Sequence, residues 1–583
     1  MTLRTLIRIP TSWMRPAMYA LGAMAEVCGL PIQTPGSESG ACTGAIEYCL
    51  PSDETRTEAL RPGFFVRIPF LASREWEAPR APAFGNWKVR ACTWVSDGTT
   101  FHVRSPRLPL GRGDVLAQWD EDGMPAIVQR QTARGTSIEF GMDAVGSFFS
   151  LATQVDDGLV AERDSHGRVP QRKTFPIATG AGGLPVASDS ALALGRAVQE
   201  GCKAADEFLL VKTCWPDDWH CVAAITHDID SIRKWIPRRL VGLLRGALAV
   251  GGVRQLNANL GDAKNRLKRF RPAGDPHRNL TALGSLEKSL QIRATYFVQM
   301  SAGRVHREPL ALYDYRDKYL RGQVDRLAGE GHEIALHASY ESADRPEAIV
   351  TEVHRLSSFR IPLGVRQHYL RISPELWTAH EGLDIAYDSS VGYSEFLGFR
   401  SGLCHPYHPY GGDGNDSLSI LELPFAAMDS AVYAAAGGDT QEMEKVLNRL
   451  GEAISSRHGL FISVWHNHYL DGALVARGSV LEGFVRHLRR TGWHLATLGE
   501  VAKWWGAREA VRLLRVKPDA WAITCERPVA ECSIQVVGGG EIEVVNLPRE
   551  DWAISGEPPI RSIVLHRLVP STTVTVRRTA GSV

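Results

Sequence analysis

The sequence predicts an α/β protein built around an irregular (β/α) barrel, with a mixed α/β domain before it and a small β-rich domain after it. From residue 221, short runs of apolar and β-branched residues alternate with helical stretches, which indicates parallel strands joined by crossover helices. The earlier part has short β-like runs interrupted by proline and glycine, and after about residue 510 the helical period disappears. The 583 residues exceed one ordinary core, so we predict three domains over residues 1–215, 216–508 and 509–583.

The barrel prediction depends on eight strand candidates at a regular spacing. The predicted strands are Cys221–Thr226, Ile292–Val298, Glu333–His337, Gly364–His368, Ile385–Asp388, Ser419–Pro424, Leu460–Trp465 and Trp493–Thr497. The predicted helices between them include Leu280–Leu290, Tyr319–Glu330, Pro346–Phe359, Gln441–Ser456 and Val480–Thr491. Outside the barrel we predict helices over Met18–Cys28 and Ala193–Leu209, and a β-sandwich or sheet over Trp521–Val583, whose role is either packing or carbohydrate binding.

Composition and charge exclude several classes of protein. A formal net charge of +1 gives no bulk field for nucleic acid, so we expect no nucleic-acid partner. The ten cysteines include no C-x-x-C pair, so neither a zinc ribbon nor a thioredoxin-type site is indicated, and free, mostly buried thiols are favoured over the alternative of a disulfide framework. The apolar stretch 17–32 contains Glu26 and is followed by no run long enough to span a bilayer, so we expect a cytoplasmic protein.

One segment is strongly basic. Between the first two barrel strands, residues 231–271 carry eleven Lys and Arg side chains against Asp262 alone, with apolar residues such as Trp235 and Leu240 interleaved. A basic amphipathic helix of this kind can lie on an anionic membrane, here the inner membrane, or bind an anionic glycan. The alternative is a solvated cationic face.

Polar side chains gather at the predicted C-terminal ends of the barrel strands, where parallel barrels carry their active sites. They are His227, Asp228 and Asp230 after the first strand, His337, Ser339 and Glu341 after the third, Arg366, Gln367 and His368 at the end of the fourth, Asp388 at the end of the fifth, and His466 and His468 after the seventh. Of the two neighbouring aspartates, one can bind a divalent cation while the other takes a proton from the water that the cation activates. Capping of the following turn is the alternative for each aspartate alone.

The histidines of the third strand have different predicted roles. His332 and His337 are five residues apart, whereas a zincin motif needs two histidines four apart on one helix face, so a zincin is excluded. Ile334 and Leu336 alternate as in a strand, on which Glu333 and His337 share the other face. His337 is therefore the candidate metal ligand, and His332 is structural.

Further candidates surround His337. Glu341 follows it by four residues, and both side chains can reach one ion if the strand runs into a helical turn. Histidine nitrogen with two carboxylate oxygens suits zinc or another first-row divalent metal. Arg366 is a fixed cation that can lower the pKa of Asp228 and orient it. His368 can be a further ligand or a substrate contact.

His466 is the candidate general acid. It follows the seventh strand between Trp465 and Asn467. For any one of these histidines a hydrogen-bonded structural role is the alternative, so the case depends on their joint placement.

Four stretches, taken in order, resemble the polysaccharide deacetylase family, the NodB-like or family 4 carbohydrate esterases. They are Thr226–Asp230, Ala294–Val298, Gly331–His337 and Trp493–Leu498, and they look like that family's first motif, its second strand, the approach to its histidine motif and its final strand. The resemblance covers about residues 221–505, half of the chain, and implies a NodB-type irregular barrel.

The closest similarity is to a divergent branch of this family found with bacterial exopolysaccharide and O-antigen genes. The matching runs are His227–Asp230, Arg366–Arg371, Tyr387–Tyr393 and Trp465–Asn467. Such proteins also tend to carry an N-terminal module, and Ser147–Leu151 and Glu162–Arg168 look similar to parts of it.

The resemblance implies a role for each site residue. Asp228 would be the base, Arg366 the partner of the base and His466 the proton donor to the leaving amine. Asp230 and His337 would bind the metal. Two departures matter: Ile229 separates the usually adjacent aspartates, and Glu341 replaces the family's second metal histidine. The third ligand therefore stays open between Glu341 and His368.

The resemblance implies a metal-dependent hydrolase that removes N-acetyl groups from amino sugars of a bacterial polysaccharide or its precursor, with zinc as the expected metal. Its catalytic step would be attack of metal-activated water on an acetamide carbonyl. Two alternatives stay open: hydrolysis of an amide or ester in a non-glycan substrate, and a catalytically weak glycan-binding or assembly protein, which the altered third ligand makes plausible.

Overall fold

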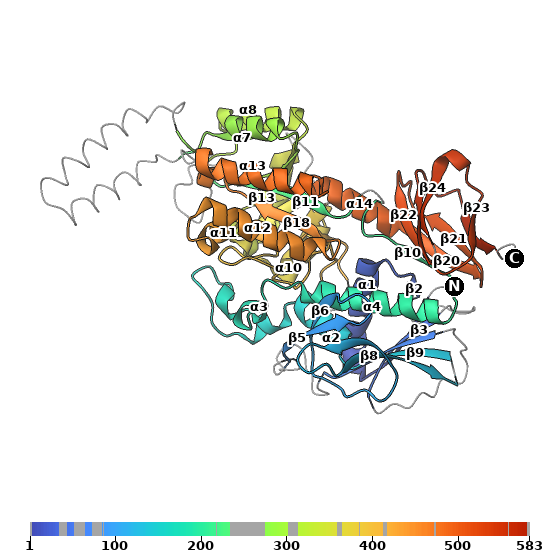
Figure 1. Cartoon of the computed structure of the whole chain (residues 1–583). Helices are drawn as coiled ribbons and strands as arrows, with labels where there is room; N and C mark the ends of the chain where they lie inside the picture. The colour runs from blue at the N-terminus through green and yellow to red at the C-terminus, as the bar shows by residue number, and fades with distance from the viewer. Residues whose placement is uncertain are drawn as a thin grey trace, which may run out of the picture.

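A computed structural model shows three regions of regular structure (Figure 1). It describes residues 3–33, 44–51, 64–72, 84, 87–133, 135–216, 219–233, 275–300, 313–357, 364–383, 385–411, 417–470, 474–557 and 559–579. In Figure 1 a curled parallel sheet with its helices occupies the centre, an α/β module lies below it, and antiparallel sheets lie to the right.

The central sheet is parallel throughout, in the strand order β16-β15-β14-β13-β12-β11-β18-β17, with β19 pairing with the start of β11. Among the described strands the edge strands β16 and β17 do not pair with each other, so the sheet is an open, irregular barrel. All eight predicted strands are present, several of them shortened. The strands are β11 (Val222–Ile229), β12 (Thr295–Val298), β13 (Glu333–Ala338), β14 (Gly364–Gln367), β15 (Tyr387–Asp388), β16 (Leu421–Glu422), β17 (Ala427–Met428), β18 (Leu460–Val464) and β19 (His494–Leu495).

Helices pack on this sheet; four of them match the predicted ranges to within two residues, and a fifth begins at Leu474, six residues before its predicted start. The helices are α7 (Leu280–Ser289), α8 (Lys318–Gly329), α9 (Glu347–Ser357), α10 (Pro374–Glu381), α11 (Asp429–Ala435), α12 (Thr440–Ser455), α13 (Leu474–Arg490) and α14 (Leu498–Ala510). Side-chain oxygens accept hydrogen bonds from the first N–H groups of several helices. Asp317 caps α8, Asp439 caps α12, and Thr497 with Glu500 forms a capping box on α14.

The alternation of side chains along β11 divides the apolar core of the barrel into two layers. Ala223 and Ile225 pack outward against the helices, whereas Val222 and Ala224 pack into the interior of the curled sheet. Because successive residues of a strand face opposite sides, the interior side continues through residue 226 to Asp228. The strand pattern thus directs Asp228 into the barrel at the carboxyl end of β11.

The N-terminal module is a mixed sheet in the order β2-β1-β3-β4-β9-β8-β7-β5-β6 with helices packed on it. Its strands are β1 (Leu3–Arg8), β2 (Ile32–Gln33), β3 (Gly44–Cys49), β4 (Phe64–Pro69), β5 (Val89–Trp94), β6 (Thr100–Arg104), β7 (Asp114–Trp119), β8 (Pro125–Thr132) and β9 (Gly135–Phe140). Its helices are α1 (Met14–Cys28), α2 (Ala144–Ala152), α3 (Phe175–Ala178) and α4 (Val186–Ala204).

The C-terminal region consists of two four-stranded antiparallel sheets, in the orders β10-β22-β25-β24 and β20-β21-β26-β23. Strand β10 precedes the barrel in the chain but pairs with β22, Leu209 lying opposite Val537. One apolar core joins these sheets to the N-terminal module. The strands are β10 (Leu209–Lys212), β20 (Val511–Lys517), β21 (Ala520–Cys525), β22 (Cys532–Val537), β23 (Glu541–Val545), β24 (Trp552–Glu557), β25 (Ile560–Leu565) and β26 (Val574–Thr579).

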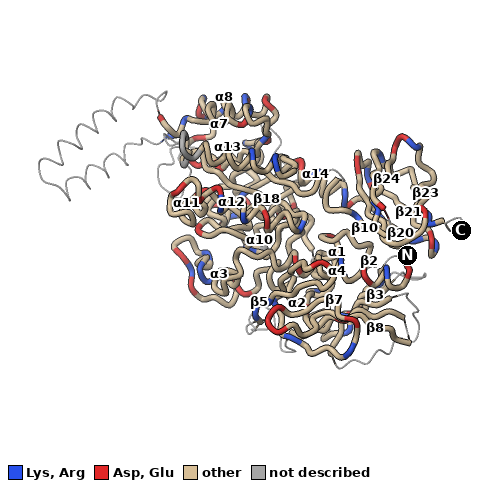
Figure 2. Tube along the Cα trace, in the orientation of Figure 1, with Lys and Arg blue, Asp and Glu red and all other residues tan. Residues whose placement is uncertain are grey.

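The predictions about charge, membrane contact and cysteines can be compared with the structure only within the described residues. Figure 2 shows Lys and Arg interspersed with Asp and Glu along the described chain, in line with the net charge of +1. Nearly all of the basic segment 231–271 lies outside the described residues, so its contact with a membrane or glycan stays a prediction. No helix in the described ranges has the length and hydrophobicity needed to cross a bilayer. The cysteines in these ranges are free thiols, and most of them are buried.

Candidate metal centre

The carboxyl end of β11 carries a buried ion pair between Asp228 and Arg366. Arg366 Nη1 donates to Asp228 Oδ1 at 2.8 Å and to Thr226 Oγ1 at 2.9 Å. Its other nitrogens donate to the backbone and hydroxyl oxygens of Ser389, and its guanidinium lies over the ring of Phe297. Since Arg366 is fully buried and these contacts use its fixed fork of donors, the orientation of Asp228 is also fixed.

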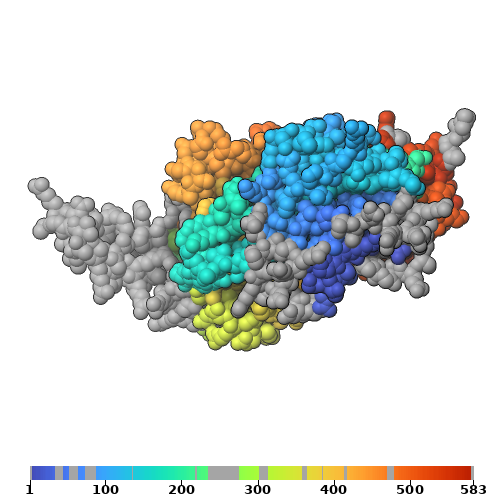
Figure 3. Space-filling view, turned by 90° about the horizontal axis from the view of Figure 1, so that it is seen from below, coloured from blue at the N-terminus to red at the C-terminus, as the bar shows by residue number. Residues whose placement is uncertain are grey.

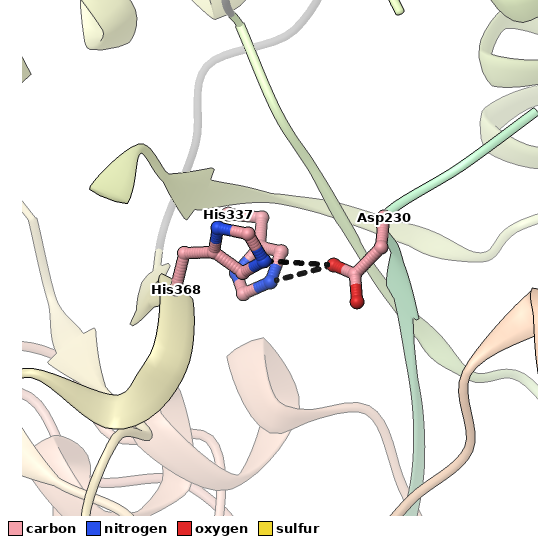
Figure 4. Close-up of side chains that lie close together, drawn as sticks. All are labelled: Asp230, His337 and His368. Carbon is pink, nitrogen blue, oxygen red and sulfur yellow. Dashed lines mark ion pairs between the residues drawn. The ribbon is translucent and has the colours of Figure 1, made fainter. Parts of the chain in front are cut away.

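Asp230, His337 and His368 bring three ligand atoms together at the same edge of the sheet (Figure 4). Nε2 of His337 lies 3.2 Å from Asp230 Oδ1, and Nε2 of His368 lies 3.5 Å from the same oxygen. The ligand atoms lie within 4.8 Å of one another. Asp230 follows β11, His337 lies on β13 and His368 follows β14; β13 and β14 are neighbours and β12 lies between β13 and β11, so the cluster forms at the carboxyl ends of one parallel sheet.

The hydrogen bonding of this cluster fits a divalent cation. His337 Nδ1 lies 2.9 Å from the carbonyl oxygen of Arg366, which can only accept, so Nδ1 carries the proton and Nε2 offers its lone pair to the cluster. That lone pair faces Asp230 Oδ1, a buried oxygen with no hydrogen-bond partner among the described residues. A shared proton or a bound cation satisfies both atoms. Two imidazole nitrogens and one carboxylate are a donor set that suits zinc and other first-row metals.

His466 lies beside the two aspartates, nearest to their Oδ2 atoms. Its backbone N–H donates to Asp429 Oδ2 at 2.7 Å, and its Nδ1 lies 3.0 Å from Asp429 Oδ1. Nε2 then points inward, 3.6 Å from Asp230 Oδ2 and 4.0 Å from Asp228 Oδ2. The carboxylate of Asp429 thus orients the ring and stabilises its protonated form.

The cluster strongly perturbs the pKa values of its members. Burial raises the pKa of Asp230, but His368, His337 and His466 outweigh this and hold the pKa well below its ordinary value. Burial likewise opposes ionisation of Asp228, and Arg366 lowers its pKa. Burial lowers the pKa of His368 to about 4, whereas Asp429 overcomes burial and raises the pKa of His466 to about 10. Such concentrated perturbation is typical of functional sites.

Glu341 is not part of this cluster. Strand β13 ends at Ala338, and the chain then forms a 3-10 helix, Tyr340–Ala343, that directs Glu341 to the surface. Its side chain is 53% exposed and pairs with Arg345 at 2.9 Å. Of the two residues left open as the third ligand, Glu341 therefore lies outside the cluster, because the turn directs its side chain to solvent, whereas His368 lies within the cluster.

His227 and His332 belong to a separate buried network on the face of the sheet that packs against the helices. His227 Nε2 lies 2.7 Å from Glu287 on α7, and the same carboxylate accepts a hydrogen bond from Tyr296. His332 Nδ1 accepts from the backbone N–H of Ala294. Since these side chains face the helix layer rather than the barrel interior, His332 is structural, as the strand pattern indicates.

Asp429 is a site residue that we did not predict. It begins α11 directly after the two-residue strand β17, which is too short to show any alternation of side chains. The sequence signal available there is an aspartate at the start of a helix, which indicates a helix cap rather than the partner of a histidine.

Neither protein-family models nor curated proteins show a match to the chain. Among solved structures it is similar to Agd3, described as a novel carbohydrate deacetylase, over 99% of both chains at 10% identity and a TM-score of 0.41. The chain is also similar to a Mycobacterium smegmatis protein described as a candidate polysaccharide deacetylase; the match covers 51% of this chain and 94% of that protein, at 17% identity and a TM-score of 0.35.

A third similar structure is a Bordetella bronchiseptica protein described as a candidate polysaccharide deacetylase involved in O-antigen biosynthesis. This chain covers 83% of that protein with 46% of its own length, at 11% identity and a TM-score of 0.22. The three similar structures are thus described as carbohydrate or polysaccharide deacetylases. At these identities and scores the likeness carries no functional argument, which depends on the site itself.

Proposed function

We propose that this protein is a metal-dependent hydrolase that removes N-acetyl groups from amino sugars of a bacterial polysaccharide or its precursor. The observation that carries the proposal is the convergence of Asp230, His337 and His368 beside a buried aspartate, Asp228, and a buried, oriented histidine, His466. The similarity of the motifs to polysaccharide deacetylases supplies the substrate class.

The three clustered residues would hold the metal, with zinc as the favoured ion. A zinc ion bound by two histidines and one carboxylate lowers the pKa of a coordinated water and polarises a carbonyl. His337 donates from Nδ1 to a backbone carbonyl, so its other nitrogen is already set as a ligand.

Asp228 is the general base in this proposal. Arg366 holds its Oδ1, which leaves Oδ2 directed toward the cluster, 3.9 Å from His337 Nε2 and 4.0 Å from His466 Nε2. An ionised carboxylate in this position can take a proton from a water placed between it and the substrate carbonyl.

His466 is the general acid. Asp429 fixes its ring and keeps Nε2 protonated and directed at the same space. Donation of that proton to the amide nitrogen allows the C–N bond to break, which releases acetate and leaves a free amine on the sugar.

The test compares metal content and acetate release in the same preparations. Asp228→Asn is expected to keep its zinc and to lose activity by about 10² to 10⁴-fold, the usual contribution of a general base. Acetate release is measured against N-acetylated sugars and O-acetyl esters, and release from the former alone supports the proposed substrate class.

Glu341→Gln is the matched control, because it also removes a carboxylate near β13 but one that is exposed. It is expected to keep both zinc and activity. Full activity in Asp228→Asn, or a wild-type protein that binds no divalent metal, would contradict the proposal.

A further inference from the structure

The turn that carries His368 has an unusual backbone. Tyr369 has φ 59° and ψ 12°, and Leu370 has φ 55°, so two consecutive residues with side chains are in the left-handed region. Residues with a Cβ adopt this conformation at a cost in free energy, so the surrounding structure must hold it in place. These two residues directly follow the candidate ligand His368.

The contact that holds this turn comes from the N-terminal module. Arg168 Nη1 donates to the carbonyl oxygen of Tyr369 at 2.5 Å, across 201 positions of the sequence. Asp164 holds the guanidinium, accepting from Nε at 2.9 Å and lying 2.8 Å from Nη2. Asp164 Oδ1 also accepts the backbone N–H groups of His166 and Arg168, which closes a tight loop around the arginine. Arg168 is only 13% exposed.

Ring contacts and a second anchor add to this contact. The imidazole of His166 lies 4.3 Å from the ring of Tyr369, and its Nδ1 lies 3.3 Å from the hydroxyl of Tyr340. Further along the segment, the side chain of Gln171 accepts from the backbone N–H of Ser394 and donates to its hydroxyl. In Figure 3 the teal surface of the N-terminal module adjoins the yellow-green surface of the barrel, in agreement with these contacts.

We propose that Arg168 is a positioning residue for the metal centre, and that residues 164–171 of the N-terminal module fix the loop that supplies the third ligand. This inference rests on the proposed metal-dependent function. Arg168 does not touch the metal ligands' coordinating atoms; it acts through the carbonyl of Tyr369 on the turn behind His368. The N-terminal module is then a component of the active site rather than a separate appendage.

The test measures metal affinity and coordination in the full-length protein. Zinc is titrated against a competing chelator, and Co²⁺ is used as a probe whose visible absorption reports its coordination geometry. Arg168→Ala is expected to weaken zinc binding by up to about 10-fold, less than the loss of a direct hydrogen-bond partner of a metal ligand can cause, and to change the Co²⁺ spectrum. Arg168→Lys keeps one donor for the carbonyl and is expected to recover part of the affinity.

Arg172→Ala is the matched control. Arg172 lies in the same segment but is 67% exposed and pairs with Glu162, so its loss is expected to leave zinc affinity and the Co²⁺ spectrum unchanged. If Arg168→Ala does not purify as a folded protein, Asp164→Asn is scored by the same criteria, because it keeps the turn and weakens the hold on the guanidinium.

Wild-type affinity and spectrum in Arg168→Ala, or an equal loss in Arg172→Ala, would overturn the inference while leaving the proposed function intact. Failure of the wild-type protein to bind zinc would instead count against the proposed function, so the two failures are distinguishable.

Discussion

The hydrogen bonds of one residue, Arg366, orient two of the site's side chains. The carbonyl of Arg366 sets the tautomer of His337, and the guanidinium of the same residue sets the orientation of Asp228. One arginine thus prepares both a metal ligand and the proposed base, through its backbone and its side chain respectively.

At this scale we predict that His368, and not Glu341, is needed for metal binding. His368→Ala removes one of three protein ligands and is expected to lower zinc affinity by at least 10-fold, whereas Glu341→Gln is expected to bind zinc as the wild type does. Isothermal titration of the metal-free proteins with zinc checks both. The reverse order of affinities would restore Glu341 as the third ligand.

At the scale of elements, the start of α2 depends on a buried carboxyl group. Asp143 accepts hydrogen bonds from the N–H groups of Gly146 and Leu71 and from the hydroxyl of Tyr48. Burial outweighs these bonds and raises its pKa to about 7. The residue therefore joins the helix to β3 and to the end of β4.

This shift predicts a pH dependence of stability. The unfolded pKa of aspartate is about 4, so below that pH both states are protonated and the contribution of Asp143 is complete. As pH rises from about 4 to about 7 the unfolded state loses its proton first, and the wild type loses stability relative to Asp143→Asn. Denaturant unfolding of both proteins at several pH values measures this difference, and a difference independent of pH contradicts the prediction.

Element boundaries were predictable where apolar residues repeat over several turns or along a whole strand. The alternation of Ile334 and Leu336 with Glu333 and His337 correctly predicted which faces of β13 they occupy. Strand β17, with two residues, leaves no such pattern, and its absence from the prediction also concealed Asp429. A helical turn does follow β13, as the expectation for Glu341 required, but the direction in which that turn points Glu341 is not determined by local spacing.

At the scale of the whole molecule, the regions before and after the barrel share one core. The pairing of β10 with β22 joins residues more than 300 positions apart in sequence, and such pairing leaves no local pattern from which it could be predicted. Arg508 on α14 strengthens the junction, donating to the backbone oxygens of Thr213 and Glu26. Lys212 donates in turn to the carbonyl of Arg508.

We therefore predict that Arg508→Ala destabilises the protein by about 1 to 3 kcal/mol, because it removes the donor to the carbonyl oxygens of Thr213 and Glu26. The side chain of Arg508 is 1% exposed. The matched control is Arg512→Ala, whose side chain is 59% exposed and pairs with Glu526, and its expected change is within about 0.5 kcal/mol. Denaturant unfolding followed by circular dichroism compares them, and equal effects of the two changes would contradict a structural role for Arg508.

An anomalous-diffraction map of crystals soaked with zinc would show directly whether Asp230, His337 and His368 bind one metal ion. We predict one strong peak within bonding distance, about 2.0 to 2.2 Å, of Asp230 Oδ1, His337 Nε2 and His368 Nε2. A zinc peak bound elsewhere, or none at these three atoms in a fully soaked crystal, would contradict the assignment of this cluster as the catalytic metal centre.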